Sequence, residues 1–135
     1  MAHVATDLSV TLPEDRPGML ARAIKAIGAA GLNIDGYAEM AGVVRVLTTD
    51  ITGTRRALER EGFRVTGEQQ VCVVDVADRP GAAGEVFQRI ADAGVNISFS
   101  YLATHNRLVI GANDVQAVLR AINSPPHQRA PGHDR

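Results

Sequence analysis

Short stretches of the chain alternate apolar and polar residues, which is the pattern of strands with one buried face. Residues 7–12 read Asp-Leu-Ser-Val-Thr-Leu, and Pro13 predicts the end of this strand because proline cannot donate to a sheet ladder. The run 71–76 is apolar almost throughout, which predicts a strand covered on both faces. Further strands are predicted at 34–40, 43–47, from 63 onward, at 97–103 and at 107–111.

Apolar residues at helical spacing lie between these strands. Pro17 is predicted to open the first helix because its fixed φ suits the first helical position, and Gly31 is predicted to cap its end in the left-handed region. The other predicted helix limits are Thr52 or Thr54 to Gly62, a start at Gly81, and a start after the cap residue Asp114.

Two motifs occur twice at the same spacing. Asp-Arg-Pro-Gly at 15–18 recurs at 78–81, and Gly-Leu-Asn-Ile at 31–34 recurs as Gly-Val-Asn-Ile at 94–97. The offset is 63 residues in both cases, from 15 to 78 and from 33 to 96, so no gap is needed between the copies. Val10 and Val73, Ile27 and Ile90, and Ala30 and Ala93 coincide at that offset too. Matched motifs at one spacing indicate an internal duplication.

The order strand-helix-strand-strand-helix-strand predicts an α+β fold, a ferredoxin-like βαββαβ unit repeated twice with antiparallel sheets and helices on one face. The first domain is predicted at 5–68 and the second at 69–123. Residues 124–135 hold three prolines and no strand pattern, which predicts a flexible tail and leaves the second domain without a fourth strand. Units this small are marginal alone, so we expect a shared core, a continuous sheet or an exchanged strand.

Composition narrows the possible partners of this chain of 135 residues. The formal net charge of −1 gives no general attraction to nucleic acid or to anionic membranes, and no apolar run has the length of a membrane span. Cys72 is the only cysteine, which excludes an internal disulfide, and the first residues lack the layout of a signal peptide. We expect a soluble cytoplasmic protein.

The repeated turns have the residue types for binding a small zwitterion. Gly18 and Gly81 lack a Cβ, so a ligand can approach the backbone closely, and the following helix start presents N–H groups to a carboxylate. Asp15 and Asp78, just before the turn, could accept bonds from an ammonium group.

Asn33 and Asn96 follow the predicted helices and carry both donor and acceptor atoms, so they could complete the same site. A purely structural interpretation competes with this one. Proline, glycine, aspartate and asparagine are ordinary residues of turns and caps, and a duplicated fold duplicates its turns.

The two Asp-Arg-Pro-Gly segments with their downstream Gly-Leu-Asn-Ile and Gly-Val-Asn-Ile resemble the signature of the ACT domain over residues 5–122. The resemblance is to stand-alone tandem ACT proteins. It implies small regulatory modules that bind amino acids at the interface between two modules, through the loop before the first helix and the start of the second strand. The implied ligand-binding residues are Asp15, Pro17, Gly18, Met19, Leu20, Asn33, Ile34, Asp78, Pro80, Gly81, Ala82, Ala83, Asn96 and Ile97.

The chain departs from one subgroup of that family, the serine-regulated phosphoglycerate dehydrogenases. In those enzymes the residue before Arg-Pro-Gly and the Asn after the helix contact the ligand, and the resemblance implies the same role for Asp15 and Asp78 and for Asn33 and Asn96. These enzymes have Asn where this chain has Asp15 and Asp78, and His where it has Pro13 and Val76. The first copy follows its glycine with Met-Leu and the second with Ala-Ala, so the two sites need not be equivalent.

Other function classes find little support in the sequence. No Gly-x-Ser-x-Gly elbow is present, the histidines His3, His105, His127 and His133 lack metal-ligand spacing, and Cys72 sits in a predicted buried strand. Aromatic residues are too few for the stacking surface of an RNA-binding module. We therefore predict no catalytic residues, no metal and no cofactor.

The sequence thus predicts a non-catalytic regulatory protein that binds an amino acid or a similar zwitterion. Exposed sheet edges favour a homodimer, and a regulated enzyme is a possible partner. The alternative is a protein-protein interaction module with no metabolite ligand.

Overall fold

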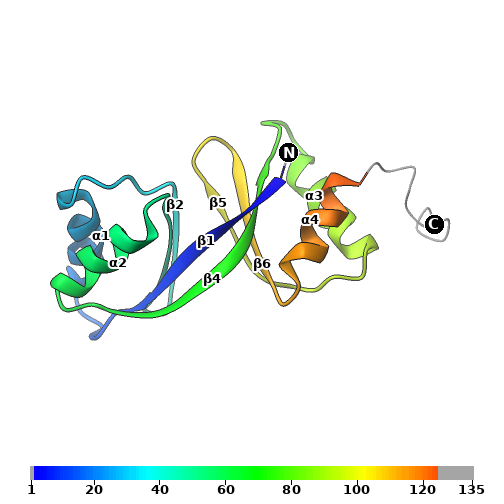
Figure 1. Ribbon diagram of the computed structural model, residues 1–135. Coiled ribbons are helices and arrows are strands. Elements are labelled where there is room, and N and C mark those ends of the chain that lie inside the picture. The colour runs from blue at the N-terminus through cyan, green and yellow to red at the C-terminus, as the bar shows by residue number, and fades with distance from the viewer. Residues whose placement is uncertain (1, 125–135) are drawn as a thin grey trace. The chain divides into compact units, whose positions relative to one another are not determined.

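The structure, a computed structural model, describes residues 2–124 and is an α+β fold with antiparallel strands and four helices in that part of the chain. It divides into a first unit, Thr6–Gln69, and a second unit made of residues 2–5 and 70–124. The elements, labelled in Figure 1, are β1 (Ala2–Thr11), α1 (Met19–Ala29), β2 (Gly36–Met40), β3 (Val43–Leu47), α2 (Ile51–Arg60), β4 (Arg64–Asp75), α3 (Ala82–Asp92), β5 (Ile97–Ala103), β6 (Arg107–Ala112) and α4 (Val115–Asn123). Residues 125–135, most of the predicted tail, lie outside the described part.

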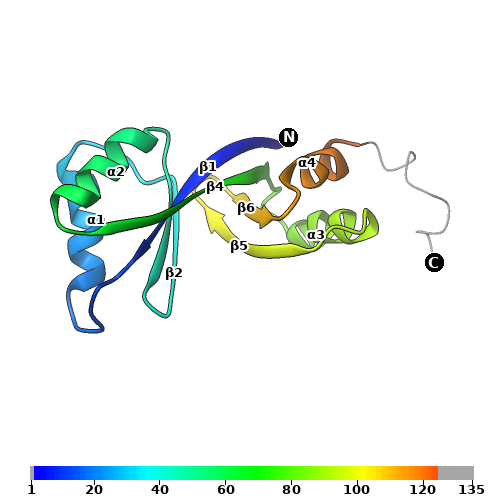
Figure 2. The ribbon, with the colours of Figure 1, turned by 60° about the horizontal axis from the view of Figure 1, so that its bottom comes forward.

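The first unit has the predicted antiparallel sheet. Its strand order is β4, β1, β3, β2, where β1 and β4 contribute the residues that belong to this unit. Val10 lies opposite Val44, and Met40 lies opposite Val43. Helices α1 and α2 lie together against this sheet in both views (Figures 1 and 2). The buried core between helices and sheet consists of Val10, Met19, Ala23, Ile27, Val44, Val46, Leu58 and Phe63.

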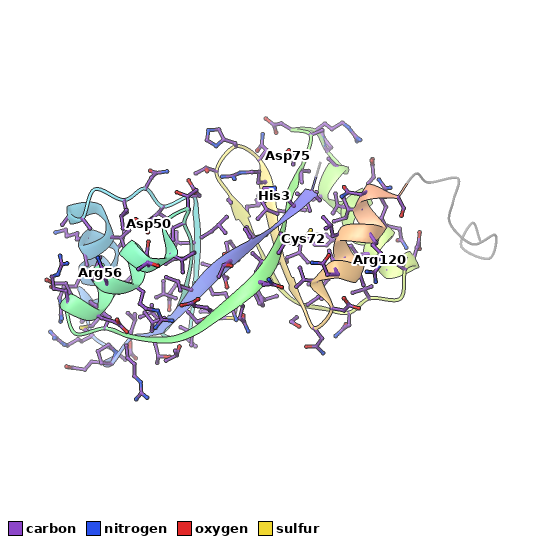
Figure 3. The ribbon with its side chains drawn as sticks, viewed as in Figure 1. His3, Asp50, Arg56, Cys72, Asp75 and Arg120 are labelled. Carbon is purple, nitrogen blue, oxygen red and sulfur yellow. The ribbon has the colours of Figure 1, made fainter. Side chains whose placement is uncertain are left out.

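The second unit has the same strand order, and its fourth strand comes from the beginning of the chain. Its strand order is β1, β4, β6, β5, in which β1 contributes residues 2–5 and β4 contributes residues 70–75. Strand β6 pairs with β4 on one side and with β5 on the other. Ala2 and Val4 pack against the core cluster while His3, labelled in Figure 3, is exposed. The buried members of this core cluster are Cys72, Val74, Ile90, Leu108, Ile110, Val115 and Val118.

Strand β4 belongs to both units without a break. The sequence predicts one strand from residue 63 and another at 71–76, whereas the structure has a single strand, Arg64–Asp75. No proline interrupts this stretch, so nothing stops the ladder between the two halves. Val71, Cys72, Val73 and Val74 are each at most 2% exposed, which confirms the strand buried on both faces.

Two predicted helix starts are wrong by a few residues. Helix α1 begins at Met19 rather than Pro17, because Gly18 at the N-cap is left-handed with a φ of +90°. Helix α2 begins at Ile51 rather than Thr52 or Thr54, because the carboxylate of Asp50 accepts a bond from Gly53 N at 2.8 Å. The predicted cap by Asp114 is confirmed by a bond from Ala117 N at 3.0 Å. Gly31 has the expected left-handed φ of +76°.

The gapless repeat is also wrong for the strands. In the first unit Leu12 N donates to Gly42 O, and in the second unit Val76 N donates to Asn106 O, so these strands correspond at an offset of 64, from 12 to 76 and from 42 to 106. The helix starts at Gly18 and Gly81 keep the offset of 63.

The shift has a local cause in two loops. The second copy has one residue fewer before its Asp-Arg-Pro-Gly and one more in its hairpin, which turns through residues 104–106 instead of through 41–42. Val10 therefore corresponds to Val74, which faces the helices, and not to Val73. Ile27 and Ile90 correspond as predicted, and both are fully buried.

Candidate functional site

The first repeated turn borders a cavity of about 600 Å³ in the first unit. The cavity lies where β1 ends and α1 begins, beside the hairpin turn between β2 and β3. Its lining residues are Leu12, Glu14, Asp15, Arg16, Pro17, Gly18, Met19, Leu20, Glu39, Ala41 and Gly42. Five of the predicted site residues, 15 and 17–20, are therefore brought together around one space.

The helix start at this cavity has unused N–H groups. No side chain caps α1. Met19 N donates to Arg16 O at 3.4 Å and Arg22 N donates to Gly18 O at 2.9 Å. Within residues 2–124, the N–H groups of Leu20 and Ala21 have no such partner. The positive end of the α1 dipole and these N–H groups suit a carboxylate.

The charged side chains around the cavity differ in how far they are already paired. Glu14 holds Arg16 Nε at 2.8 Å, and Glu39 accepts a bond from Gly42 N at 2.9 Å. Asp15 is exposed and makes no hydrogen bond or ion pair with any other described residue. Asp15 is thus the carboxylate available to a cationic group of a ligand.

Gly18 is required at this turn for its backbone conformation. Its φ is +90°, and an added Cβ would meet no atom within 4 Å. Gly81 has the same geometry, with a φ of +89° and open space around a Cβ. The two turns are therefore conformational copies, and side chains rather than backbone make them different.

Asn33 and Ile34 lie away from this cavity. Gly36, which begins β2, lies opposite Leu47, which lies opposite Asp7 near the start of the unit's share of β1. The Asp-Arg-Pro-Gly turn follows the other end of β1, and the 11-residue helix α1 spans about 16 Å between the two ends. Asn33 donates instead to Asp35 at 3.0 Å. One unit alone does not bring Asp15 and Asn33 together.

In the second repeated turn an arginine is already paired. Arg79 donates to both carboxylate oxygens of Glu85, at 3.0 and 2.9 Å, and this pairing lowers the pKa of Glu85. Glu85 lies in the first turn of α3, where α1 carries Arg22. The start of α3 therefore carries an ion pair, Arg79 with Glu85, whereas the corresponding position of α1 carries an arginine.

The predicted site residues of the second unit, like those of the first, lie at both ends of a helix. Asp78, Pro80 and Gly81 are exposed, Ala82 is 6% exposed, and Ala83 is half-buried. Asn96 is exposed just before β5, and Ile97 packs against the core cluster. These two follow α3, whereas Asp78 precedes it, so they too lie at opposite ends of a helix of 11 residues.

Sequence reasoning missed the contribution of the β2–β3 hairpin. Glu39, Ala41 and Gly42 line the cavity although they are more than twenty residues from Asp15 in the sequence. The sequence held a signal for this contact. If the strand after the turn at 41–42 pairs with the first strand, the turn lies beside the residues that follow the first strand. The bond from Leu12 N to Gly42 O at 2.7 Å makes that connection.

Other chemistry in the described part of the chain is limited. Cys72 is fully buried on β4 (Figure 3), and burial raises its pKa to about 11, so the thiol stays protonated at neutral pH. Residues 2–124 contain no group of three or more His, Cys, Asp or Glu placed to hold a metal ion. None of the four helices there has both the length and the apolar character needed to cross a bilayer.

Comparison with known proteins supports the resemblance for the second copy. Residues 70–124 match the ACT domain. None of the curated proteins matches the chain. A crystal structure of a protein from Bacteroides thetaiotaomicron is similar, with a TM-score of 0.76 and 26% identity over 90% of this chain and 88% of that one.

A regulatory subunit of an aspartate kinase and an intact aspartokinase are similar to this chain in fold. The ligand-free regulatory subunit from Thermus thermophilus has a TM-score of 0.62 and 20% identity over 90% of this chain and 93% of that one. Escherichia coli aspartokinase III in complex with lysine and aspartate has a TM-score of 0.56 and 20% identity over 89% of this chain, which spans 31% of that enzyme. The fold of both units is thus found in solved proteins.

Proposed function

We propose that this protein is a non-catalytic regulatory protein that binds an amino acid or a similar small zwitterion. The observation that carries the proposal is the cavity of about 600 Å³ at the start of α1, where unused N–H groups and the unpaired carboxylate of Asp15 border one space. No reacting group is needed for this role.

The chemistry of the cavity fits both ends of such a ligand. A ligand carboxylate would accept bonds from the N–H groups at the start of α1, and a ligand ammonium group would donate to Asp15. Leu12, Met19 and Leu20 add apolar surface that would accommodate a side chain. The lining holds three carboxylates, of Glu14, Asp15 and Glu39, and one cation, Arg16, which already pairs with Glu14, so we favour a zwitterion over a plain anion.

We propose that the first unit is a second ACT-like module, which makes the chain a tandem ACT protein. The support is the shared strand order and the repeated Asp-Arg-Pro-Gly turn with its left-handed glycine. Asn33 and Ile34, or Asn96 and Ile97, would then serve a ligand held by the turn of a different module, because one unit does not bring them to its own turn. Residues 78 and 80–83 would form the corresponding second turn, and a homodimer would supply further modules.

A metabolic enzyme is the proposed partner of this regulatory protein. The fold is shared with the regulatory subunit of an aspartate kinase and with part of an aspartokinase complex containing lysine and aspartate. An amino-acid ligand and a kinase-type partner would be consistent with those likenesses.

The test is a thermal-shift screen of the full chain with the proteinogenic amino acids. A ligand at 100 times its Kd should add about 2.7 kcal/mol of stability. Asp15→Asn keeps the shape and removes the charge, so it should abolish the shift. Asp78→Asn is the matched control in the second turn and should retain it. A screen without any shift, or equal loss in both variants, would contradict binding at the first turn.

A protein-interaction role is the second candidate, and exposed apolar side chains favour it. Met40 is 80% exposed and Leu102 is 66% exposed, on hairpin strands of the two units. Single exposed apolar residues are common, so their effect on association must be measured. Sedimentation of Met40→Ser and Leu102→Ser variants would show a loss of assembly under this role, and unchanged assembly would argue against it.

A further inference from the structure

The cavity at the start of α1 has more negative charge than a neutral amino acid can balance. Of its three lining carboxylates, that of Glu14 is paired with Arg16 Nε at 2.8 Å. Asp15 is exposed and has no partner among the described residues. Within residues 2–124, Glu39 accepts only a bond from the neutral N–H of Gly42, at 2.9 Å. Two carboxylates therefore border this space without a cation.

Glu39 faces the side of the sheet on which α1 begins. It lies opposite Val44 in the pairing of β2 with β3, and Val44 belongs to the buried core between the sheet and its helices. Directly opposite residues of an antiparallel pair project to the same face of a sheet. The bond from Gly42 N holds the carboxylate at the hairpin turn. Its position is therefore set by β2 and this turn, and not by the loop that carries Asp15.

The second unit has no carboxylate at the position equivalent to Glu39. The strands of the two units correspond at an offset of 64, so Leu108 is the counterpart of Val44. Leu102 lies opposite Leu108 and thus takes the place of Glu39. Leu102 is 66% exposed, so the position makes no demand for packing either. The fold forms the same hairpin without an acidic residue, which leaves the charge of Glu39 without a structural reason.

We propose that this cavity selects an amino acid whose side chain carries a second positive charge, and that Glu39 determines this preference. The inference rests on the proposed function, because it uses the same ligand carboxylate at the start of α1 and the same ligand ammonium group at Asp15. A neutral amino acid leaves Glu39 without a cation. An ammonium or guanidinium group on the ligand side chain supplies one through a charge-assisted hydrogen bond.

The apolar part of the lining suits the stem of such a side chain. Leu12 and Leu20 are half-buried and border the same space. Long basic side chains bury their methylene groups along apolar surface and keep the charged end among polar groups. An acidic side chain would instead add a further carboxylate beside Asp15 and Glu39, and the repulsion between like charges disfavours that class.

L-Lysine and L-norleucine are the probes, titrated calorimetrically into the full chain. They share the α-ammonium group, the α-carboxylate and a side chain of four carbons, and only lysine has the terminal ammonium group. The wild type should bind lysine about tenfold more tightly than norleucine, because only lysine makes the charge-assisted hydrogen bond to Glu39. Added salt should reduce this difference, since the charges border solvent.

Glu39→Gln keeps an oxygen for the bond from Gly42 N and removes the charge, so it should abolish the preference for lysine. Glu59→Gln is the matched control. It removes an exposed carboxylate of the same unit that does not line the cavity, and it should keep the preference. Asp15→Asn should weaken the binding of both probes, because both carry the α-ammonium group. Circular dichroism shows whether each variant is folded.

The outcomes separate this inference from the proposed function. If norleucine binds as tightly as lysine, the inference is overturned while the proposed function stands. A preference that persists in Glu39→Gln also overturns it, since Glu39 then does not determine the selection. Binding of neither probe overturns the inference, and it overturns the proposed function as well when no other proteinogenic amino acid shifts the melting temperature.

Discussion

The two units have the same strand order but differ in how the second helix connects to the fourth strand. In the first unit α2 leads through residues 61–63 into β4, and this connection places Phe63 in the core. In the second unit the fourth strand is made of residues 2–5, and the described part of the chain ends one residue after α4, so it holds no counterpart of Phe63. The same strand order is thus completed by different parts of the chain in the two units.

The repeated turns show a second difference on nearly identical backbones. Gly18 and Gly81 have φ values of +90° and +89°, yet the first helix turn carries Arg22 where the second carries Glu85. The arginine of the first turn, Arg16, pairs with Glu14 before the helix, whereas Arg79 of the second turn pairs with Glu85 on the helix. Asp15 and Asp78 are alike in having no partner among the described residues. Nearly identical backbones therefore carry different arrangements of charge.

The largest expected effect comes from removing the Phe63 side chain from the core of the first unit. Phe63→Ala should lower the free energy of unfolding by about 3–5 kcal/mol, because it leaves a cavity among Val10, Ala23 and Leu58. Urea unfolding followed by circular dichroism measures the loss. Phe87→Ala, a half-buried aromatic on α3, is the control and should cost less. An equal cost for both would mean that Phe63 is not specially important.

The next effect tests whether residues 2–5 truly complete the second unit. Val4→Asp places a carboxylate against the second core cluster and should cost about 1–3 kcal/mol, while His3→Asp on the exposed side of the same strand should cost little. The rate at which Cys72 reacts with a thiol reagent reports opening of this unit, since the thiol is fully buried. Similar Cys72 protection in both variants would contradict the role of this strand.

A smaller effect tests whether the two repeated turns need the same backbone conformation. Gly18→Ala and Gly81→Ala should each cost about 1–2 kcal/mol, because both positions need a left-handed φ. Gly28→Ala in α1 is the control and should instead stabilise by about 0.5–1 kcal/mol, since the added Cβ meets nothing within 4 Å. Thermal unfolding measures all three. Unequal costs at the two turns would show that they are not conformational copies.

The smallest effect concerns the ion pair of the second turn. The folded state lowers the pKa of Glu85 through Arg79, so the stabilisation is present above the pKa of an unfolded glutamate and is lost as pH falls through the lower folded pKa. Glu85→Gln should flatten the acid side of the stability-pH curve slightly, and added salt should reduce the difference. An unchanged curve would indicate that the exposed pair contributes nothing.

Much of the fold could be predicted from the sequence, because alternation, helical spacing and cap residues are local signals. The hairpin at 41–42 and the cap at Asp114 belong to this group. The one-residue shift of the repeat could not be predicted within 71–76, since a strand that is apolar on both faces gives no periodic signal to choose Val74 over Val73. Residues 2–5 were too short a stretch to reveal which sheet they join.

The candidate site was predicted only in part for a similar reason. The residues of the first turn are contiguous in sequence, so the motif indicated them together. The hairpin residues beside them depend on contacts between distant segments. The separation of Asp15 from Asn33 required knowing the direction of each strand, which a repeated motif does not encode.

The placement of residues 2–5 has a consequence for how the protein is made. This segment is translated before the first unit, yet the neighbours that it needs, residues 70–75, emerge only after the whole first unit has been translated. The sheet of the second unit therefore cannot be completed until the chain has been made beyond the first unit. A bulky peptide inserted directly ahead of Ala2 should lower the refolding yield more than the same peptide inserted in the hairpin turn at 104–106.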